Sequence, residues 1–406
     1  MNAPLRRGAC PGLSAPMPTG DGLLARFRPA GTVALDALAG LATAARRHGN
    51  GILEITSRGS IQIRGLTAET APAFADDVAK LGIAAHDGVP VIADPLAGLD
   101  PTEAIDAEEL AAELRRALAA QPFANALSPK VSVIIDGGGQ LSLDALTADV
   151  RLHAEATERG VRIHVAVAGD SATAIPIRAI ERAQVVETVV ELLGTIAARG
   201  AAARARDIGS WVQQGSLAIG RMSDPIGLHH LRNDQIALGI GFVFGHTDAH
   251  TLEALIDSAR AAGASGVRTA PGRALLIIGI AATRVVPLSS AAAALGFIID
   301  PNDPRRRVVA CAGAPVCAAA EIPSRALAPA VAAAAAPLLA AGEVIHVSGC
   351  AKSCAHHGVA ALTAIGRAGR CDLLVDGGPA GVVAPEALPQ TLAQLAQRRH
   401  RRAAHG

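Results

Sequence analysis

The chain has 406 residues, half of them hydrophobic and 18% charged, which predicts roughly two to four folded domains and excludes a disordered protein. Its 37 basic and 36 acidic residues nearly cancel, so no overall charge would attract nucleic acid or an anionic membrane. Aromatic residues make up only 2% of the chain, too few for the stacking surfaces that single-stranded nucleic acid needs.

The N-terminal region predicts no targeting segment. Residues 10–20 read CPGLSAPMPTG, and these prolines and glycines interrupt the apolar core that a secretory signal requires. The best candidate for a membrane span, residues 326–341, is short and is interrupted by Pro329 and Pro337. We therefore expect a cytoplasmic protein without membrane contact, in which thiols stay reduced.

Two stretches of the chain repeat one order of elements. Residues 22–66 and residues 236–280 each predict a strand, a helix and two further strands, because apolar residues recur at three- and four-residue steps between runs of branched residues. Gly49 and Gly263 lie where helix C-termini favour glycine. We interpret the two stretches as a duplication; chance similarity between two α/β units is the alternative.

Longer α/β segments follow each repeat. The first is expected to include a helix at 107–120, and the second a helix at 326–339. In the second segment, residues 375–383 predict a strand that Gly377 and Gly378 interrupt.

The chain is therefore expected to alternate small and large units. The predicted divisions are an N-terminal arm with the first small unit at 1–75, a large unit at 76–225, a second small unit at 226–287, a second large unit at 288–397 and a solvated basic tail at 398–406. Only the second large unit holds paired cysteines, so we expect a pseudo-twofold molecule with one active half.

Four of the six cysteines form two close pairs. Cys311 and Cys317 make a C-x5-C pair, and after 32 intervening residues Cys350 and Cys354 make a C-x3-C pair. Four thiolates from two loops are the ligands that an iron–sulfur cluster needs. Structural zinc sites usually separate their paired cysteines by about two to four residues, and a disulfide framework would need a higher density of cysteine. We favour a cluster, with zinc or unrelated cysteines as the alternatives.

Several motifs together resemble the nitrite/sulfite reductase superfamily. GDGLLARFRPAG (20–31), ITSRGSIQIRGL (55–66) and the two cysteine pairs follow in the expected order over nearly the whole chain. The resemblance implies an α/β (α+β) fold in which two ferredoxin-like half-domains alternate with two larger α/β domains. It also implies a 4Fe–4S cluster on Cys311, Cys317, Cys350 and Cys354, and a bridge from Cys354 to sirohaem iron where sirohaem is bound.

Within that superfamily, four further motifs most resemble the precorrin-3B synthases: RRGACPGLSAPMPTGDGLL (6–24), PLAGLDP (95–101), SPKVSVIIDGGG (128–139) and SGCAKSCAHHG (348–358). That resemblance implies a monooxygenase of aerobic cobalamin biosynthesis, which hydroxylates precorrin-3A at C20 with dioxygen and closes a lactone. It also implies an additional iron centre, mononuclear iron or sirohaem, whose ligands the sequence does not reveal. NADH-derived electrons would come from an external reductase or ferredoxin, because no dinucleotide-binding motif is present.

Basic residues distinguish the members of this superfamily. Reduction of sulfite or nitrite needs several fixed cations around a small anion. Arg58 and Lys130 match two of the reductases' cation positions, but Ser132 stands where they add a lysine and Val89-Pro90 where they carry an Arg-Asn pair. This weighs against reduction of those anions. A sirohaem-dependent nitrite or sulfite reductase stays the first alternative, and a non-enzymatic cluster-bearing electron carrier the second.

A tetrapyrrole substrate explains the cations that remain, because its acetate and propionate carboxylates suit the planar fork of arginine. Arg58, Gln62 and Arg64 lie an even number of residues apart in a strand-like run, so alternation places them on one face. We expect that face, with Lys130, to line a tetrapyrrole pocket; the polar outer face of a half-buried strand is the alternative. We interpret Arg273, at the start of the corresponding strand in the second repeat, as structural.

Three more residues stay without an assigned function. His356 and His357 follow the cluster motif, where they would tune the cluster, ligate iron or carry a proton, or else lie in a turn without a function. Cys10 is expected to be a buried free thiol, although the arm that carries it could approach the site. The sequence assigns no catalytic residue.

Overall fold

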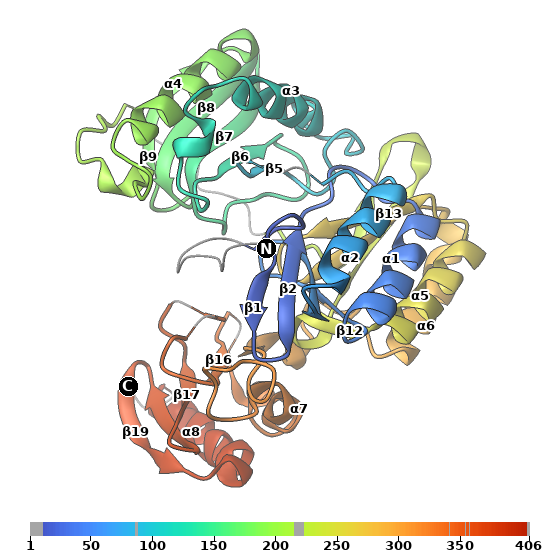
Figure 1. Ribbon diagram of the computed structural model, residues 1–406, viewed down its shortest axis with the longest axis vertical. Coiled ribbons are helices and arrows are strands. Elements are labelled where there is room, and N and C mark those ends of the chain that lie inside the picture. Colours follow the sequence, from blue (N-terminus) through green and yellow to red (C-terminus); the bar gives the residue numbers. More distant parts are fainter. Residues whose placement is uncertain are drawn as a thin grey trace.

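The computed structural model describes residues 11–85, 88–214, 223–340, 342–353, 355–356 and 358–403. Figure 1 shows two large α/β units at opposite ends of the molecule and the two small units between them. No helix in the described ranges is both long and apolar enough to cross a membrane.

The first small unit is built on an antiparallel sheet. Its elements are β1 (Met17–Thr19), β2 (Gly22–Phe27), α1 (Leu35–His48), β3 (Ile52–Ile55), β4 (Ile61–Leu66) and α2 (Thr70–Lys80). The strand order is β1-β2-β4-β3-β12, and β12 (His246–Asp248) is contributed by the second small unit. The two small units therefore share one sheet edge.

The second small unit repeats this arrangement. Its elements are β10 (Gly227–His230), β11 (Ile236–Gly241), α5 (Ala249–Ala261), β13 (Gly266–Ala270), β14 (Ala274–Ile280) and α6 (Ala282–Ala294), with the strand order β10-β11-β14-β13. A bulge interrupts the β2–β4 pairing at Gly65 and the β11–β14 pairing at Gly279, and both glycines have left-handed φ angles, +73° and +81°. Order, pairing and bulge all match, which supports a duplication.

Gly49 and Gly263 end the equivalent helices for different reasons. Gly263 has a φ of +76°, the left-handed conformation that favours glycine after a helix. Gly49 has a φ of −123°, which any residue can adopt. It is needed for space, because a Cβ there would lie 2.4 Å from the carbonyl oxygen of Arg64.

The two large units also share one topology. The first contains β5 (Val91–Ala93), α3 (Ala107–Ala119), β6 (Val133–Asp136), β7 (Ala148–Thr157), β8 (Gly160–Gly169), β9 (Ile175–Ile180) and α4 (Val185–Ala197). The second contains β15 (Val308–Ala310), α7 (Ser324–Ala335), β16 (Ile345–Ser348), β17 (Leu362–Arg367), β18 (Arg370–Val375), β19 (Gly378–Val383) and α8 (Leu388–Ala403). Each sheet follows chain order, with three parallel strands and then two antiparallel ones.

Two expectations about the second large unit were wrong. Residues 375–383 do not form one strand, because Gly377, with a φ of +82°, makes the turn between β18 and β19. The basic stretch that begins at Arg398 continues α8 instead of forming a solvated tail. Arg399 pairs there with Glu343 and with Asp376 at 2.9 Å.

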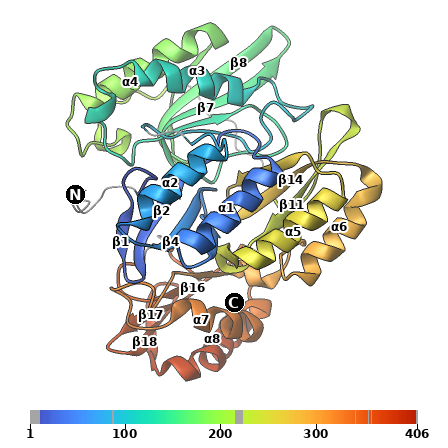
Figure 2. The ribbon, with the colours of Figure 1, turned by 45° about the vertical axis from the view of Figure 1, so that its right-hand side comes forward.

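A single hydrophobic core joins the two small units. The helices α1, α2, α5 and α6 cover one face of the paired sheets (Figure 2). Leu41, Ile63, Leu252 and Ile277 are almost fully buried together in this core. The opposite face of each sheet points toward the large units. Because side chains alternate along a strand, this second face is free to differ between the two repeats.

Candidate functional site

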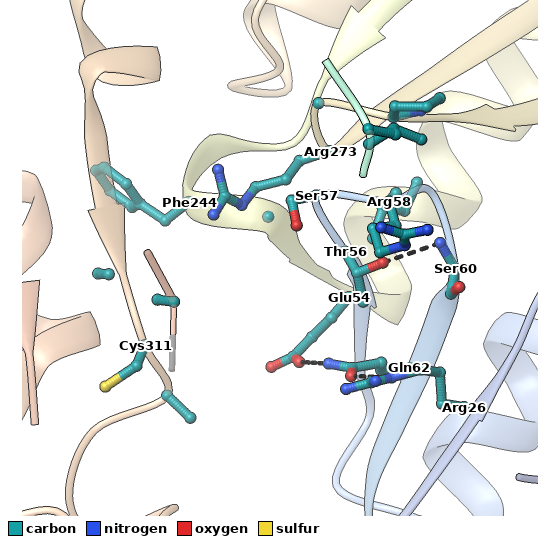
Figure 3. Close-up of a pocket in the computed structure, with 18 of the residues that line it drawn as sticks. Arg26, Glu54, Thr56, Ser57, Arg58, Ser60, Gln62, Phe244, Arg273 and Cys311 are labelled. Carbon is teal, nitrogen blue, oxygen red and sulfur yellow. Dashed lines mark hydrogen bonds between the residues drawn. The ribbon is translucent and has the colours of Figure 1, made fainter. Parts of the chain in front are cut away.

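A cavity of about 960 Å³ lies where all four units meet. The first small unit supplies the faces of β2, β3 and β4, and the first large unit supplies residues 141–147. Loops of the second small unit and the cysteine-bearing loops of the second large unit complete the lining. Figure 3 shows Cys311 on one side of this space and Glu54 with Gln62 on the other.

A chain of polar side chains forms the sheet wall of the cavity. Arg26, Gln62 and Glu54 are paired across β2, β4 and β3, so all three point to the same face. Arg26 Nε donates to Gln62 Oε1 at 2.6 Å, and Gln62 Nε2 donates to Glu54 Oε2 at 2.6 Å (Figure 3). Arg325, from the start of α7, pairs with Glu54. This chain therefore ties the first small unit to the cysteine-bearing unit.

Arg58 and Arg64 both line the cavity, but from different elements. Arg64 lies on β4 and donates to Asp21 Oδ1 at 3.1 Å and to the carbonyl of Val316, in the C-x5-C loop, at 3.3 Å. Arg58 lies in the turn before β4 and donates to the carbonyl of Thr147 at 3.0 Å. The expected polar face therefore consists of Gln62 and Arg64 on the strand, with Arg58 added from the turn.

Lys130 does not line the cavity, contrary to expectation. It is exposed, in the turn that leads to β6, and is not among the lining residues. Its neighbour Ser132 is the residue that approaches the site, since Ser132 Oγ lies 3.5 Å from Arg58 Nη2. The turn directs the lysine toward solvent.

Arg28 is a cation that the sequence interpretation missed. Its Nη2 atom is buried and has no hydrogen-bond partner among the described residues. Burial, together with the charges of Arg58 and Arg115, lowers the pKa of Arg28 to about 10. Arg28 lies one residue beyond the end of β2 and is not among the residues that line the cavity.

The cysteine loops meet because their strands are parallel neighbours. Cys311 follows β15 and Cys350 comes two residues after β16, and the carboxyl ends of adjacent parallel strands meet at one sheet edge. Cys311, Cys317 and Cys350 are partly buried free thiols that line the cavity. Cys354, His357 and Cys10 lie outside the described residues.

The surroundings of Cys311 suit a thiolate ligand. Its Sγ accepts a hydrogen bond from the backbone N–H of Gly349 at 3.1 Å and lies 3.6 Å from Ser324 Oγ. A Cβ on Gly349 would lie 2.6 Å from the Cβ of Ala320 and 3.3 Å from this sulfur, so only glycine lets the two loops approach. Donors aimed at a cysteine sulfur stabilise the anionic sulfur of an iron–sulfur cluster. The position of Cys311 therefore suits a cluster ligand.

The described thiols do not by themselves converge on one metal position. Within the described ranges no three His, Cys, Asp or Glu side chains, Cys311, Cys317 and Cys350 included, lie close enough together to hold one metal ion. The ring of His356 lies 5.7 Å from the ring of His346, and its buried Nε2 has no hydrogen-bond partner among the described residues.

The first large unit carries an aspartate where the second carries Cys311. Asp94 follows β5 as Cys311 follows β15, and Asp94 Oδ2 accepts from the N–H of Gly137 at 3.1 Å, as the sulfur accepts from Gly349. Asp94 is only 3% exposed, and burial with the nearby charge of Asp136 raises its pKa to about 8. A single carboxylate thus replaces the thiol in the half without paired cysteines.

The sheet face opposite Asp94 replaces two of the polar side chains by apolar ones, although Arg268, paired with Leu276, remains there and donates to the carbonyl of Ala97 at 2.7 Å. Counting from the matching bulge glycines, Leu276 corresponds to Gln62 and Ile278 to Arg64. Both are buried with Leu96 and Leu141 of the first large unit in an apolar core. One symmetry-related site is therefore open and polar, and the other is closed by hydrophobic packing.

Comparisons with known proteins identify the fold class. A family model described as the nitrite/sulfite reductase ferredoxin-like half domain matches residues 15–81. The solved structure of the NirA protein of Mycobacterium tuberculosis superimposes with a TM-score of 0.70 and 20% identity, covering 91% of this chain and 79% of that one. The chain therefore has a nitrite/sulfite reductase-like α/β fold, as expected.

Relatives in sequence identify the family. A precorrin-3B synthase of a Sinorhizobium species is 37% identical over 390 residues, covering 94% of this chain and 85% of the relative. A ferredoxin-dependent sulfite reductase of Mycolicibacterium paratuberculosis is 27% identical over 167 residues, which cover 39% of this chain and 29% of that enzyme. The chain belongs to the precorrin-3B synthase family and is an oxidoreductase.

Proposed function

We propose that this chain hydroxylates precorrin-3A at C20, with dioxygen and external reducing equivalents, and that the product closes a lactone. The observation that carries the proposal is the cavity, which has an arginine-rich sheet wall on one side and cysteine thiols on the other. Of the substrates considered, a macrocycle with many carboxylates is the one that an arginine-rich wall would bind best.

The size and charge of the cavity support a tetrapyrrole as the substrate. The volume of about 960 Å³ is near the upper end of the roughly 300–1,000 Å³ typical of small-molecule sites. Carboxylates are outnumbered among the lining residues, where Glu54 and Asp224 face the cations Arg26, Arg58, Arg64, Arg273, Arg306, Arg325 and Lys352. Acetate and propionate groups would complement this excess of positive charge.

We assign a 4Fe–4S cluster to Cys311, Cys317, Cys350 and Cys354, which when bound supplies one-electron transfer. The chain's own contribution is to hold donors against Cys311 Sγ and to fix the arginine wall opposite. The additional iron centre, mononuclear iron or sirohaem, has no assigned protein ligand; Cys354 would bridge to sirohaem. NADH-derived electrons would enter through an external reductase or ferredoxin.

The polar chain of the sheet wall would orient the macrocycle. Gln62 fixes both Arg26 and Glu54, so neither side chain can rotate away without breaking a hydrogen bond. Arg64 is held by Asp21, and Arg325 by Glu54. Pre-oriented donors bind a carboxylate with less loss of side-chain entropy than mobile ones.

The test is turnover of precorrin-3A by protein purified without oxygen and loaded with iron and sulfide. With a reductant, an electron-transfer partner and isotopically labelled dioxygen, mass spectrometry should find one labelled oxygen atom in the product. A protein that reduces sulfite or nitrite and returns precorrin-3A unchanged would instead be a sirohaem-dependent reductase. One that transfers electrons without converting either substrate would be a carrier.

A further inference from the structure

Arg273 lies at the tip of the β13–β14 hairpin, held against the first small unit. The backbone N–H of Gly272 donates to the carbonyl of Ser57 at 2.9 Å, and the N–H of Phe242 donates to the carbonyl of Arg273 at 2.9 Å. Two hydrogen bonds therefore fix the backbone at this point. Pro271, Gly272 and Arg273 of this tip line the cavity.

The backbone at Arg273 has a conformation that favours glycine. Its φ is +64°, in the left-handed region where a residue with a Cβ is strained. Counting back from the bulge glycines Gly65 and Gly279, the matching residue of the first repeat is Gly59, with a φ of +80°. The duplication therefore places an arginine where the repeat otherwise has glycine, and retained strain of this kind points to a function.

The side chain of Arg273 is directed into the cavity. Figure 3 shows its guanidinium between Phe244 and Ser57, and Arg273 is among the residues that line the cavity. The arm passes over Gly245, where a Cβ would lie 2.8 Å from Arg273 Cδ. Gly245 thus provides the space that the arm needs.

The charge of Arg273 has no protein partner among the described residues. The neighbouring cations Arg64, Arg306 and Arg325 pair with Asp21, Asp224 and Glu54 respectively. Arg273 is partly buried, and burial lowers its pKa. A half-buried guanidinium without a counter-charge is unfavourable until an anion pairs with it.

We propose that Arg273 binds a carboxylate of the substrate, so that the second small unit supplies a specificity-determining contact for a polycarboxylate macrocycle. This inference rests on the proposed function. On this inference, the second small unit, whose equivalent site is closed by hydrophobic packing, contributes a substrate contact to the open site beside the first small unit. It also corrects the interpretation of Arg273 as structural.

The test uses Arg273→Gly, Arg273→Gln and Arg273→Lys in the full-length, iron-loaded protein. Uroporphyrin serves as the polycarboxylate probe, and its dissociation constant is measured by fluorescence quenching. We expect Gly and Gln to weaken binding roughly tenfold or more, because a charge-assisted hydrogen bond is lost, and Lys to retain part of it. Arg284→Gln, an exposed arginine on α6 of the same unit, is the matched control and should bind like the wild type.

The unfolding temperature distinguishes the loss of a substrate contact from damage to the folded structure. Glycine relieves the left-handed backbone, so Arg273→Gly should unfold at the same or a higher temperature than the wild type while binding more weakly. Wild-type affinity in both Arg273→Gly and Arg273→Gln would overturn the inference and leave the proposed function intact. A wild-type protein that neither binds uroporphyrin nor converts precorrin-3A would overturn both.

Discussion

Ser324 is buried beside Cys311 at the first residue of α7, with its hydroxyl oxygen 3.6 Å from the sulfur. In a cluster-bound thiolate, this hydroxyl would donate and stabilise the more negative, reduced state. Ser324→Ala should therefore lower the midpoint potential of the cluster by roughly 40 mV, the equivalent of about 1 kcal/mol for one electron. An anaerobic redox titration followed by electron paramagnetic resonance measures it.

The control for that titration is Ser290→Ala, which removes an exposed hydroxyl from α6. It should leave the potential unchanged. An unchanged potential in Ser324→Ala as well would mean that the hydroxyl does not interact with the cluster ligand.

Asp94 makes stability depend on pH. Its pKa rises from 3.8 to about 8 on folding, so between those values the folded chain holds a proton that the unfolded chain has released. The free energy of unfolding should therefore fall as pH increases through this window. Asp94→Asn mimics the protonated carboxyl and should flatten that dependence, with a higher melting temperature than the wild type at pH 8. Parallel pH profiles for the two proteins would contradict this assignment.

Site residues could be recognised from the sequence where the chemistry requires a particular type of side chain. The cysteine motif and the Arg58–Arg64 stretch directed attention to residues that line one cavity. The sequence did not reveal the burial of Arg28, and it did not reveal that Arg273 lines the cavity, because both depend on how the units pack. Nor could it reveal that a turn carries Lys130 away.

At the scale of elements, Gly65 and Gly279 provide a matched pair of bulges with different surroundings. A Cβ on Gly65 would meet the backbone nitrogen of Asn50 at 2.8 Å, whereas one on Gly279 would first meet the side chain of Ser265, at 2.4 Å from its Oγ. A hydroxyl can rotate away and a backbone cannot. Both alanine substitutions carry the left-handed cost of about 1–2 kcal/mol, and Gly65→Ala should cost roughly 1 kcal/mol more.

Chemical denaturation of the two alanine variants measures this difference in the free energy of unfolding. Equal losses, or a larger loss for Gly279→Ala, would show that the first small unit adjusts its backbone at Asn50 more easily than the contacts indicate.

The helices and strands of the small units followed from periodicity, because each has one apolar face in a common core. The pseudo-twofold relation of the two large units was predicted, but their strand order was not. Their shared topology is carried by backbone pairing, while residues at equivalent positions differ as much as Asp94 and Cys311 do. The hairpin at Gly377 read as one interrupted strand because the residues on both sides of the turn favour strands.

At the scale of the whole molecule, duplication created two equivalent positions and only one stayed open. Gln62→Leu copies the closed half into the open one and removes the hydrogen bonds that hold Arg26 and Glu54. It should weaken uroporphyrin binding roughly tenfold, since the sheet wall loses its fixed donors.

The reciprocal change, Leu276→Gln, buries an amide in the apolar core of the closed half. It should lower the free energy of unfolding by about 1–3 kcal/mol and leave uroporphyrin affinity unchanged. Gln62→Leu should therefore change uroporphyrin affinity, whereas Leu276→Gln, at the equivalent position, should change only the free energy of unfolding. Weaker binding in Leu276→Gln at a temperature where it is folded would show that the closed half takes part in the site.

A pocket beside Arg58, Gln62 and Arg64 was predicted, but its full lining could not be, because that lining comes from all four units and depends on how they pack. The order of units and the position of the cysteines implied one active half. The wall made by the second small unit became evident only with the hairpin tip in place.

The most direct measurement is an anaerobic crystal structure of the iron-loaded protein with a bound tetrapyrrole. The account predicts electron density for the macrocycle between the Arg26–Gln62–Glu54 wall and the cysteine loops, with carboxylates on Arg58 and Arg273. Density for the macrocycle elsewhere on the molecule, or a metal centre without Cys311 among its ligands, would contradict it.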